Sequence, residues 1–311
     1  MAKVHLASLR AVLREEGWDA FLVTQPENRR YLSDFTGSAG FLLITPQRHW
    51  LCTDFRYVEQ AASQAAGFEV KKVEGDATTF LAHLLLGFQA RTVAFESHHV
   101  TVAEMRRWQE VAPHIEWIPT ENVVERLRLC KGPEEMEAIR QAVKLADEAF
   151  AEVSRILRAG LTEREVAWEL EAQMRKRGAE RVAFELIVGS GPNGAMPHAV
   201  ISQRKIRAGE PVVIDMGAVF DGYNSDMTRT VSLRAADARY LEIYEIVLEA
   251  QQKAEAALKP GMTGPEVDRV ARQVIEEAGY GEHFGHGLGH GVGLSVHEGP
   301  RLSQTSQETL Q

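Results

Sequence analysis

The sequence predicts a two-domain protein of the α+β fold class, on the basis of its length, its composition and the order of its apolar patterns. Its 311 residues exceed the length of one average domain, which is about 100 to 200 residues. An apolar content of 44% and a charged content of 25% are typical of globular proteins and exclude a disordered or collagen-like chain. The two parts of the chain also differ in pattern, so we expect a separate domain in each.

The first part, residues 1–123, alternates short apolar runs with helical stretches, which is typical of an α/β domain. Helices are predicted over residues 58–66 and 102–111. The runs predicted as strands are AFLVT, GFLLIT, HWLCT, TVAFE and IEWIP.

A long helix begins the second domain, residues 124–311, just after Gly132-Pro133. Its apolar residues recur every three or four positions, as a helix requires. They are Met136, Ile139, Val143, Ala146, Phe150, Val153 and Leu157.

Beyond this helix one pattern occurs twice. The segments Leu157–Gly178 and Leu258–Gly279 align without gaps, and each contains Thr-x-x-Glu, beginning at Thr162 and at Thr263. This motif predicts a capping box, in which the threonine and glutamate side chains satisfy free N–H groups at a helix start. A glycine segment led by phenylalanine follows each helix, so we expect a duplicated helix-then-strand unit. Two helix starts with similar sequences by chance remain the alternative.

The stretch GSGPNG, Gly189–Gly194, matches a dinucleotide-binding pattern, and Asp215 follows at about the spacing of the ribose-binding acid. However, the last glycine should open a helix that holds the pyrophosphate, and the following residues contain Pro197 and no helical period. We therefore predict a loop that carries His198 and no nucleotide site.

A hairpin is predicted at Asp221-Gly222, because both residues of a type I′ turn need positive φ. In that register Gly217 faces Asp226, and Asp215 points to the same face, with Gly217 expected to leave room between the carboxylates. Two carboxylates this close repel each other unless a proton, a base or a cation lies between them, and a divalent cation suits both. Two solvated aspartates on an exposed hairpin face remain the alternative.

The segment FGHGLGHGVGLSVHEGP, residues 284–300, combines alternating glycines with histidines that include His290 and His297. We expect glycines 285, 287, 289, 291 and 293 to allow close packing and unusual dihedral angles. The histidines offer imidazole ligands, and beside two aspartates they indicate a site for Mn²⁺, Co²⁺, Zn²⁺ or Fe²⁺. The lack of thiolate ligands argues against a structural zinc.

The remaining histidines without a supporting motif are predicted to be surface or packing residues. They are His5, His49, His83, His98, His99 and His114.

Charge and composition limit the partners and the compartment. The net charge of -9 argues against nucleic acid, and no run approaches the roughly 18 apolar residues that a membrane span needs. The N-terminus has a charged amphipathic pattern instead of a signal peptide, and only two cysteines occur, Cys52 and Cys130. We expect a cytoplasmic protein with neither nucleic acid nor membrane as partner.

Three stretches together resemble the pita-bread metallopeptidases, and within them the proline-specific group of Xaa-Pro dipeptidases (prolidases) and aminopeptidase P. They are IDMGAVFDGYNSDMTRT, HGLGHGVGLSVHEGP and GSGPNGAMPH. The resemblance covers almost the whole chain. It implies a creatinase-type N-terminal domain over residues 1–123 and a pita-bread catalytic domain over residues 124–311.

The resemblance implies a role for five residues. Asp215, Asp226 and His290 correspond to ligands of two divalent ions, with Mn²⁺ or Co²⁺ expected first and Zn²⁺ also compatible. His198 and His297 correspond to the histidines that bind the substrate carbonyl and stabilise the oxyanion. An Xaa-Pro dipeptide or oligopeptide is the implied substrate, and a homodimer the implied assembly.

Family members continue into two further strands, each with a glutamate that completes the metal site, whereas this sequence ends at Gln311. It therefore offers three of the five ligands. We expect a sequence limited to the ordered or expressed part of a longer protein, in preference to a true truncation or a naturally shortened homologue. An uncovered sheet edge at this point would favour aggregation.

Two other functions remain open. A creatinase-like hydrolase would share the fold without metals, although Asp215, Asp226 and His290 argue against it. A non-catalytic pita-bread module that binds peptides or proteins, or an inactive truncated form, is the other. Between dipeptidase and aminopeptidase the residues do not decide, and we favour a dipeptidase or a general Xaa-Pro peptidase.

Overall fold

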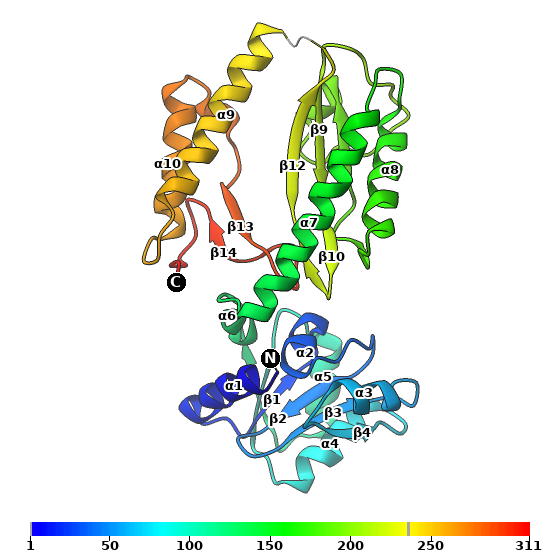
Figure 1. Ribbon diagram of the computed structural model, residues 1–311. Coiled ribbons are helices and arrows are strands. Elements are labelled where there is room, and N and C mark those ends of the chain that lie inside the picture. The colour runs from blue at the N-terminus through cyan, green and yellow to red at the C-terminus, as the bar shows by residue number, and fades with distance from the viewer. Residues whose placement is uncertain (1, 235–236) are drawn as a thin grey trace. The chain divides into compact units, whose positions relative to one another are not determined.

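A computed structural model describes residues 2–234 and 237–311 (Figure 1). They form two compact units, Met1–Arg128 and Leu129–Gln311. The boundary expected between residues 123 and 124 falls at the start of α6 (Val123–Arg128), the last helix of the first unit. No helix among the described residues combines the length and the apolar character that a membrane span requires.

The N-terminal unit is built on one six-stranded sheet with the order β4-β3-β2-β1-β5-β6 (Figure 1). Its strands are β1 (Ala20–Val23), β2 (Phe41–Ile44), β3 (His49–Thr53), β4 (Glu69–Lys72), β5 (Thr92–Glu96) and β6 (Glu116–Thr120). Besides α6, its helices are α1 (Ala2–Glu16), α2 (Pro26–Ser33), α3 (Val58–Gln64), α4 (Ala77–Gly87) and α5 (Val102–Val111). All five predicted strands and both predicted helices are present.

The strand that the apolar pattern missed is β4, which has the sequence Glu-Val-Lys-Lys and lies at one edge of the sheet. Charged residues are frequent on edge strands because they hinder pairing with another chain, and they also hide the apolar alternation. The core beside the sheet contains several aromatic side chains, among them Trp108 stacked on Trp117 with ring centroids 5.0 Å apart.

The C-terminal unit contains two similar halves, each with two helices followed by antiparallel strands (Figure 1). The first half consists of α7 (Pro133–Ile156), α8 (Glu163–Lys176), β7 (Arg181–Val182), β8 (Ile187–Ser190), the 3₁₀ helix η1 (Gly191–Ala195), β9 (Pro211–Met216), β10 (Ala218–Phe220), β11 (Tyr223–Asn224) and β12 (Met227–Ser232). The second half consists of α9 (Ala238–Ala257), α10 (Gly264–Glu277), the 3₁₀ helix η2 (Gly281–His283), β13 (Gly289–Gly291) and β14 (Glu298–Leu302).

Both predicted capping boxes are present, at the starts of α8 and α10. Each capping threonine also forms an isolated antiparallel bridge with a residue later in its half, Thr162 with Lys205 and Thr263 with Thr309. Shared tertiary contacts of this kind support duplication, because two helix starts that were similar by chance would not share them.

The buried face of α7 differs from the apolar stripe seen in the sequence. Met136 and Val143 of that stripe are 38% and 41% exposed. The stripe residues Ala146 and Val153 are buried as predicted, and the other buried apolar residues of α7 are mostly alanines: Ala138, Ala142, Leu145 and Ala149. Small side chains let α7 approach the hairpin closely, and the Ser225 hydroxyl donates a hydrogen bond of 3.1 Å to the carbonyl oxygen of Ala142.

Candidate metal centre

The hairpin that carries the two aspartates has the predicted register. Asp221 and Gly222 have φ angles of 44° and 71°, as a type I′ turn needs. Val219 pairs with Asn224 on β10 and β11, and Met216 pairs with Met227 on β9 and β12 with the same offset. Gly217 therefore lies opposite Asp226, two residues from Asp215.

Gly217 is needed for a different reason from the one expected. A Cβ atom at this position would lie 2.1 Å from the carbonyl oxygen of Ser225 and 2.8 Å from the Phe184 ring. The space beside Gly217 is therefore filled by strand backbone and an aromatic ring, and does not separate the carboxylates. A side chain here would push the two strands apart.

His290 lies on β13, in a ribbon with β14 whose glycines pack closely. A Cβ atom on Gly291 would lie 2.1 Å from the carbonyl oxygen of Gly299, and Gly287 and Gly293 are similarly crowded. The unusual dihedral angles predicted for this segment are absent, because none of its five alternating glycines has positive φ. An extended ribbon requires close approach of backbone and no left-handed residue.

Three of the predicted side chains converge. The possible ligand atoms of Asp226, His290 and His297 all lie within 4.8 Å of one another. Nε2 of His290 is 3.5 Å from Oδ2 of Asp226, and the His290 and His297 rings lie 4.4 Å apart between centroids. His297, expected to contact substrate, thus also places a ring nitrogen beside two expected metal ligands.

The orientation of the His290 ring fits a cation. Its Nδ1 lies 3.0 Å from the carbonyl oxygen of Gly291, which only accepts, so Nδ1 carries a hydrogen. Nε2 therefore is the ring nitrogen that faces the Asp226 carboxylate, and this position is suited to a metal ion or a proton between the two groups. A carboxylate beside imidazoles is a donor set that suits a divalent transition metal.

Four of the five predicted site residues line one cavity of about 330 Å³: His198, Asp215, Asp226 and His297. His290 is the fifth, and it approaches this cavity through Asp226. Apolar side chains, including Phe184, form part of the wall. Ligand pockets commonly combine apolar walls with a few convergent polar groups.

Asp215 is the more enclosed of the two aspartates. Burial raises the pKa of Asp215, and the negative charge of Asp226 acts in the same direction. The Thr228 hydroxyl, which donates a hydrogen bond of 2.8 Å to Oδ1, and the nearby His297 both lower it. The ionised form of this carboxylate is thus disfavoured where it stands, and a bound cation would stabilise it.

Glu163, the first residue of α8, holds the loop of His198 and was not recognised from the sequence. Its side chain is fully buried and accepts hydrogen bonds from Ser190, Asn193 and Ser202, at distances of 2.6 to 3.2 Å. These residues flank His198 on both sides. An acid in the first turn of a helix is common, because it interacts favourably with the helix dipole, so this glutamate did not stand out.

A buried ion pair on α10 holds the other histidine segment. Arg272 donates to both oxygens of Asp268 at 2.7 and 3.1 Å. The same guanidinium donates to the carbonyl oxygens of Phe284 and His286 at 2.8 Å each, and Asp268 accepts from the backbone N–H of Leu288 at 3.0 Å. The four-residue spacing of the pair is visible in the sequence, but it is equally typical of an exposed helix face.

Glu298, next to His297, forms a salt bridge with a lysine side chain. Its carboxylate lies 2.6 Å from Nζ of Lys131, and both side chains are at most 10% exposed. The Glu298 carboxylate therefore already has a positively charged partner within the protein.

Comparisons with known proteins give the same picture. The model of metallopeptidase family M24 matches residues 137–311, and that of the creatinase/prolidase N-terminal domain matches residues 5–130. An Xaa-Pro dipeptidase of Pyrococcus horikoshii is 37% identical, over 94% of this chain and 82% of its own length.

Solved structures are similar along the whole chain. An Xaa-Pro dipeptidase from Bacillus anthracis is 41% identical with a TM-score of 0.96, covering 100% of this chain and 87% of its own. An X-Pro aminopeptidase from Thermotoga maritima is also 41% identical, with a TM-score of 0.88 and coverage of 96% and 87%. The two-domain architecture, the cluster of possible ligands and the family matches lead to one conclusion: the chain belongs to metallopeptidase family M24 and begins with a creatinase/prolidase N-terminal domain.

Proposed function

We propose that the protein hydrolyses Xaa-Pro peptide bonds with two divalent metal ions, held in part by Asp215, Asp226 and His290. The observation that carries the proposal is the convergence of the possible ligand atoms of Asp226, His290 and His297 within 4.8 Å of one another. Relatives named as Xaa-Pro dipeptidase and X-Pro aminopeptidase support the bond type. When bound, two such ions would polarise the scissile carbonyl group and lower the pKa of a water molecule.

The side chains of the cavity have separate roles in this proposal. Asp215 and Asp226 supply negative charge from one face of the hairpin, and His290 supplies a neutral imidazole nitrogen. His198 and His297 line the same cavity and donate hydrogen bonds to the carbonyl oxygen as negative charge develops on it. The apolar wall around Phe184 excludes water from the bond that breaks.

Proline sets the physical problem that such an enzyme solves. A bond to proline has no N–H and adopts the cis form more readily than other peptide bonds. Peptidases that grip an extended chain through its N–H groups therefore handle it poorly. We propose a dipeptidase or general Xaa-Pro peptidase, since relatives of both names are equally identical to this chain.

We also propose Mn²⁺ or Co²⁺ as the metal, with Zn²⁺ as a further compatible ion, and a homodimer in the cytoplasm. The mixed carboxylate and imidazole donors support the choice of metals. Two free thiols, buried Cys52 and exposed Cys130, support a reducing compartment.

The test is metal-dependent peptide hydrolysis. After treatment with EDTA, protein resupplied with Mn²⁺ or Co²⁺ should release proline from Ala-Pro and alanine from Ala-Pro-Ala, and should leave Ala-Ala intact. The Asp226→Asn variant is the matched inactive control, because it keeps the shape and removes the charge. If Ala-Pro and Ala-Pro-Ala both remain intact in the presence of either metal, the proposed function is wrong.

A further inference from the structure

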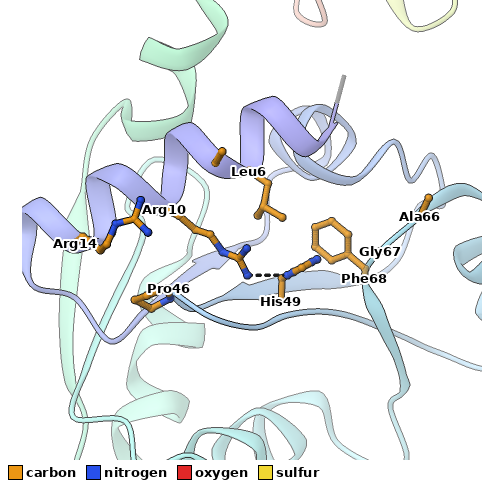
Figure 2. Close-up of a pocket in the computed structure, with 9 residues that line it drawn as sticks. Leu6, Arg10, Arg14, Pro46, His49, Ala66, Gly67 and Phe68 are labelled. Carbon is orange, nitrogen blue, oxygen red and sulfur yellow. Dashed lines mark hydrogen bonds between the residues drawn. The ribbon is translucent and has the colours of Figure 1, made fainter.

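A second cavity, of about 430 Å³, lies in the N-terminal unit between α1, the turn before β3 and the segment before β4 (Figure 2). Its lining includes Leu6, Arg10 and Arg14 of α1, with Pro46, His49 and Phe68 opposite. All of these residues belong to the unit that does not contain the candidate metal centre.

The cavity carries positive charge without a carboxylate to balance it. Two arginines line it, and none of the described residues that line it is acidic, although the protein has a net charge of -9. Burial and the charge of Arg14 both lower the pKa of Arg10, as expected for two cations in one partly enclosed space. No hydrogen bond or ion pair joins Arg14 to another described residue. Arg14 is exposed, whereas Arg10 is partly buried, and because partly buried charges are normally paired, an anionic partner fits beside Arg10.

Arg10 is held in a fixed orientation across the cavity (Figure 2). Its Nε donates to the carbonyl oxygen of Thr45 at 3.0 Å, and its Nη2 lies 2.8 Å from Nδ1 of His49. Because a guanidinium only donates, Nδ1 of His49 accepts this bond, and the His49 ring is neutral. Burial, together with the charge of Arg10, lowers the pKa of His49. His49 therefore orients Arg10 without adding charge, and Nη1 has no partner among the described residues.

The rest of the lining is largely apolar. Leu6, Pro46 and Phe68 contribute side chains to it, and the Phe68 ring packs edge-on against His49 with centroids 4.6 Å apart. The cavity volume lies within the range of about 300 to 1,000 Å³ that is usual for small-molecule sites. An inorganic anion would leave this apolar surface exposed to water, and an uncharged apolar molecule would leave both arginines unpaired.

We propose that this cavity binds a small organic carboxylate that carries an apolar group. The carboxylate accepts hydrogen bonds from the free edge of the Arg10 guanidinium and is attracted by Arg14, while the apolar group covers Leu6 and Phe68. Arginine is suited to this task, because its planar fork matches the two oxygens of a carboxylate. The site is independent of the proposed peptidase activity.

Isothermal titration of the full chain with phenylacetate tests the proposal. Phenylacetate should bind with a stoichiometry of one, and the neutral, nearly isosteric phenylacetamide and inorganic phosphate should each bind at least about tenfold more weakly. Arg10→Gln should weaken phenylacetate binding by about tenfold or more, and Arg14→Gln by a smaller factor. Arg106→Gln, which removes an exposed arginine of α5, should leave it unchanged.

Two controls keep the result specific. EDTA is present throughout, so that the probe does not bind metal at the other site. Arg14→Gln removes no hydrogen bond or ion pair between described residues and should melt like the wild type, so that weaker binding by this variant is not due to misfolding. Equal binding of phenylacetamide, equal binding of phosphate, or unchanged affinity in both arginine variants would each overturn the proposal.

Discussion

At the scale of single residues, His290 and His198 should separate metal binding from catalysis. His290 directs its Nε2 at Asp226, whereas His198 lines the cavity outside the group of converging ligand atoms. His290→Ala should therefore lower the affinity for Mn²⁺ strongly. His198→Ala should retain Mn²⁺ and lose about 10² to 10³ in kcat, the usual cost of removing one hydrogen-bond donor from an oxyanion.

Titration calorimetry with Mn²⁺ and steady-state hydrolysis of Ala-Pro measure these two effects. His114→Ala provides a matched control, since this histidine lies in the N-terminal unit, outside the cavity residues. Equal Mn²⁺ affinity of the wild type and the His290 variant would refute the assignment of His290 as a ligand.

Glu163 gives a second prediction at this scale. The Glu163 carboxylate is the acceptor in all of its hydrogen bonds. In Glu163→Gln one carboxylate oxygen becomes an NH₂ group, which cannot accept a hydrogen bond and would face the donors that bound this oxygen. Leaving buried donors unpaired costs about 1 to 3 kcal/mol, so the unfolding free energy should fall by that amount. Because the loop of His198 loosens, kcat for Ala-Pro should fall as well, while Mn²⁺ affinity should not change.

Urea unfolding and calorimetry on the same preparation check this pattern. Glu165→Gln, at the exposed capping position two residues further, should have a smaller effect on both stability and kcat. Loss of Mn²⁺ affinity in Glu163→Gln would show that Glu163 supports the whole site and not the His198 loop in particular.

The two kinds of site residue differ in how far the sequence predicts them. Asp215 and Asp226 were paired correctly on one hairpin face, because a two-residue turn fixes the register of everything that follows it. Glu163 and Asp268 were not identified, because burial and loop contacts distinguish them from ordinary helix acids. Those contacts join residues up to 39 positions apart, and no local pattern encodes them.

At the scale of elements, the second helix of each half holds the histidine loop of that half. α8 uses Glu163 for the loop of His198, and α10 uses Asp268 with Arg272 for the segment that leads to His290. The acids occupy different positions in the repeat, so duplication supplied the arrangement and not the individual contacts. The capping threonines fix where each helix begins. The start of the helix in turn determines where along the loop its acidic side chain lies.

The α10 anchor predicts a loss of metal affinity without a change in any proposed ligand. In Asp268→Asn the carboxylate is lost, so Arg272 is left without its ion-pair partner and holds the carbonyl groups of Phe284 and His286 less firmly. Groups that orient metal ligands typically contribute about 10- to 100-fold to affinity, so Mn²⁺ binding should weaken by that factor.

Calorimetry with Mn²⁺, at a temperature where the variant is fully folded, measures the effect. Arg269→Gln is the control, because Arg269 forms an exposed pair with Glu276 on the same helix and should leave affinity unchanged. A destabilised Asp268→Asn variant with the Mn²⁺ affinity of the wild type would limit the pair to a structural role.

Elements were predicted well where the pattern was local. For the two helices expected in the N-terminal domain and for both capping boxes, neighbouring residues in the sequence determine where the helix begins. The face of α7 could not be predicted in the same way, because the tight contact with the hairpin selects alanines over the larger side chains of Met136 and Val143. Hydrophobicity alone favours the larger residues, and close packing reverses the choice.

At the scale of the whole molecule, each unit has its own core, and tryptophan reports mainly on the first one. Trp18, Trp50, Trp108 and Trp117 belong to the N-terminal unit, whereas Trp168 is an exposed residue of the C-terminal unit. Intrinsic fluorescence should therefore follow unfolding of the N-terminal unit, and metal binding should follow the state of the other.

A buried acid makes the stability of the N-terminal unit depend on pH. Glu96, at the end of β5, is 5% exposed and accepts hydrogen bonds from the backbone N–H groups of Thr24 and Gln25 and from the side chain of Asn28, at 2.7 to 2.8 Å. Burial raises the pKa of Glu96 to about 7 from an ordinary value of 4.5. The Glu96 side chain is thus still protonated in the folded protein at pH values where it is already ionised in the unfolded chain.

The unfolding free energy should therefore fall as pH rises from about 4.5 to about 7, and level off above. The slope is at most about 1.4 kcal/mol per pH unit, since one unit of pKa difference corresponds to that energy. Urea unfolding followed by tryptophan fluorescence at pH 5, 6, 7 and 8 measures the fall, and Glu96→Gln should remove it because an amide does not titrate in this range. Subtracting the Glu96→Gln curve cancels the other titrating groups, so a flat difference between the two proteins across this range would show that Glu96 is ionised throughout.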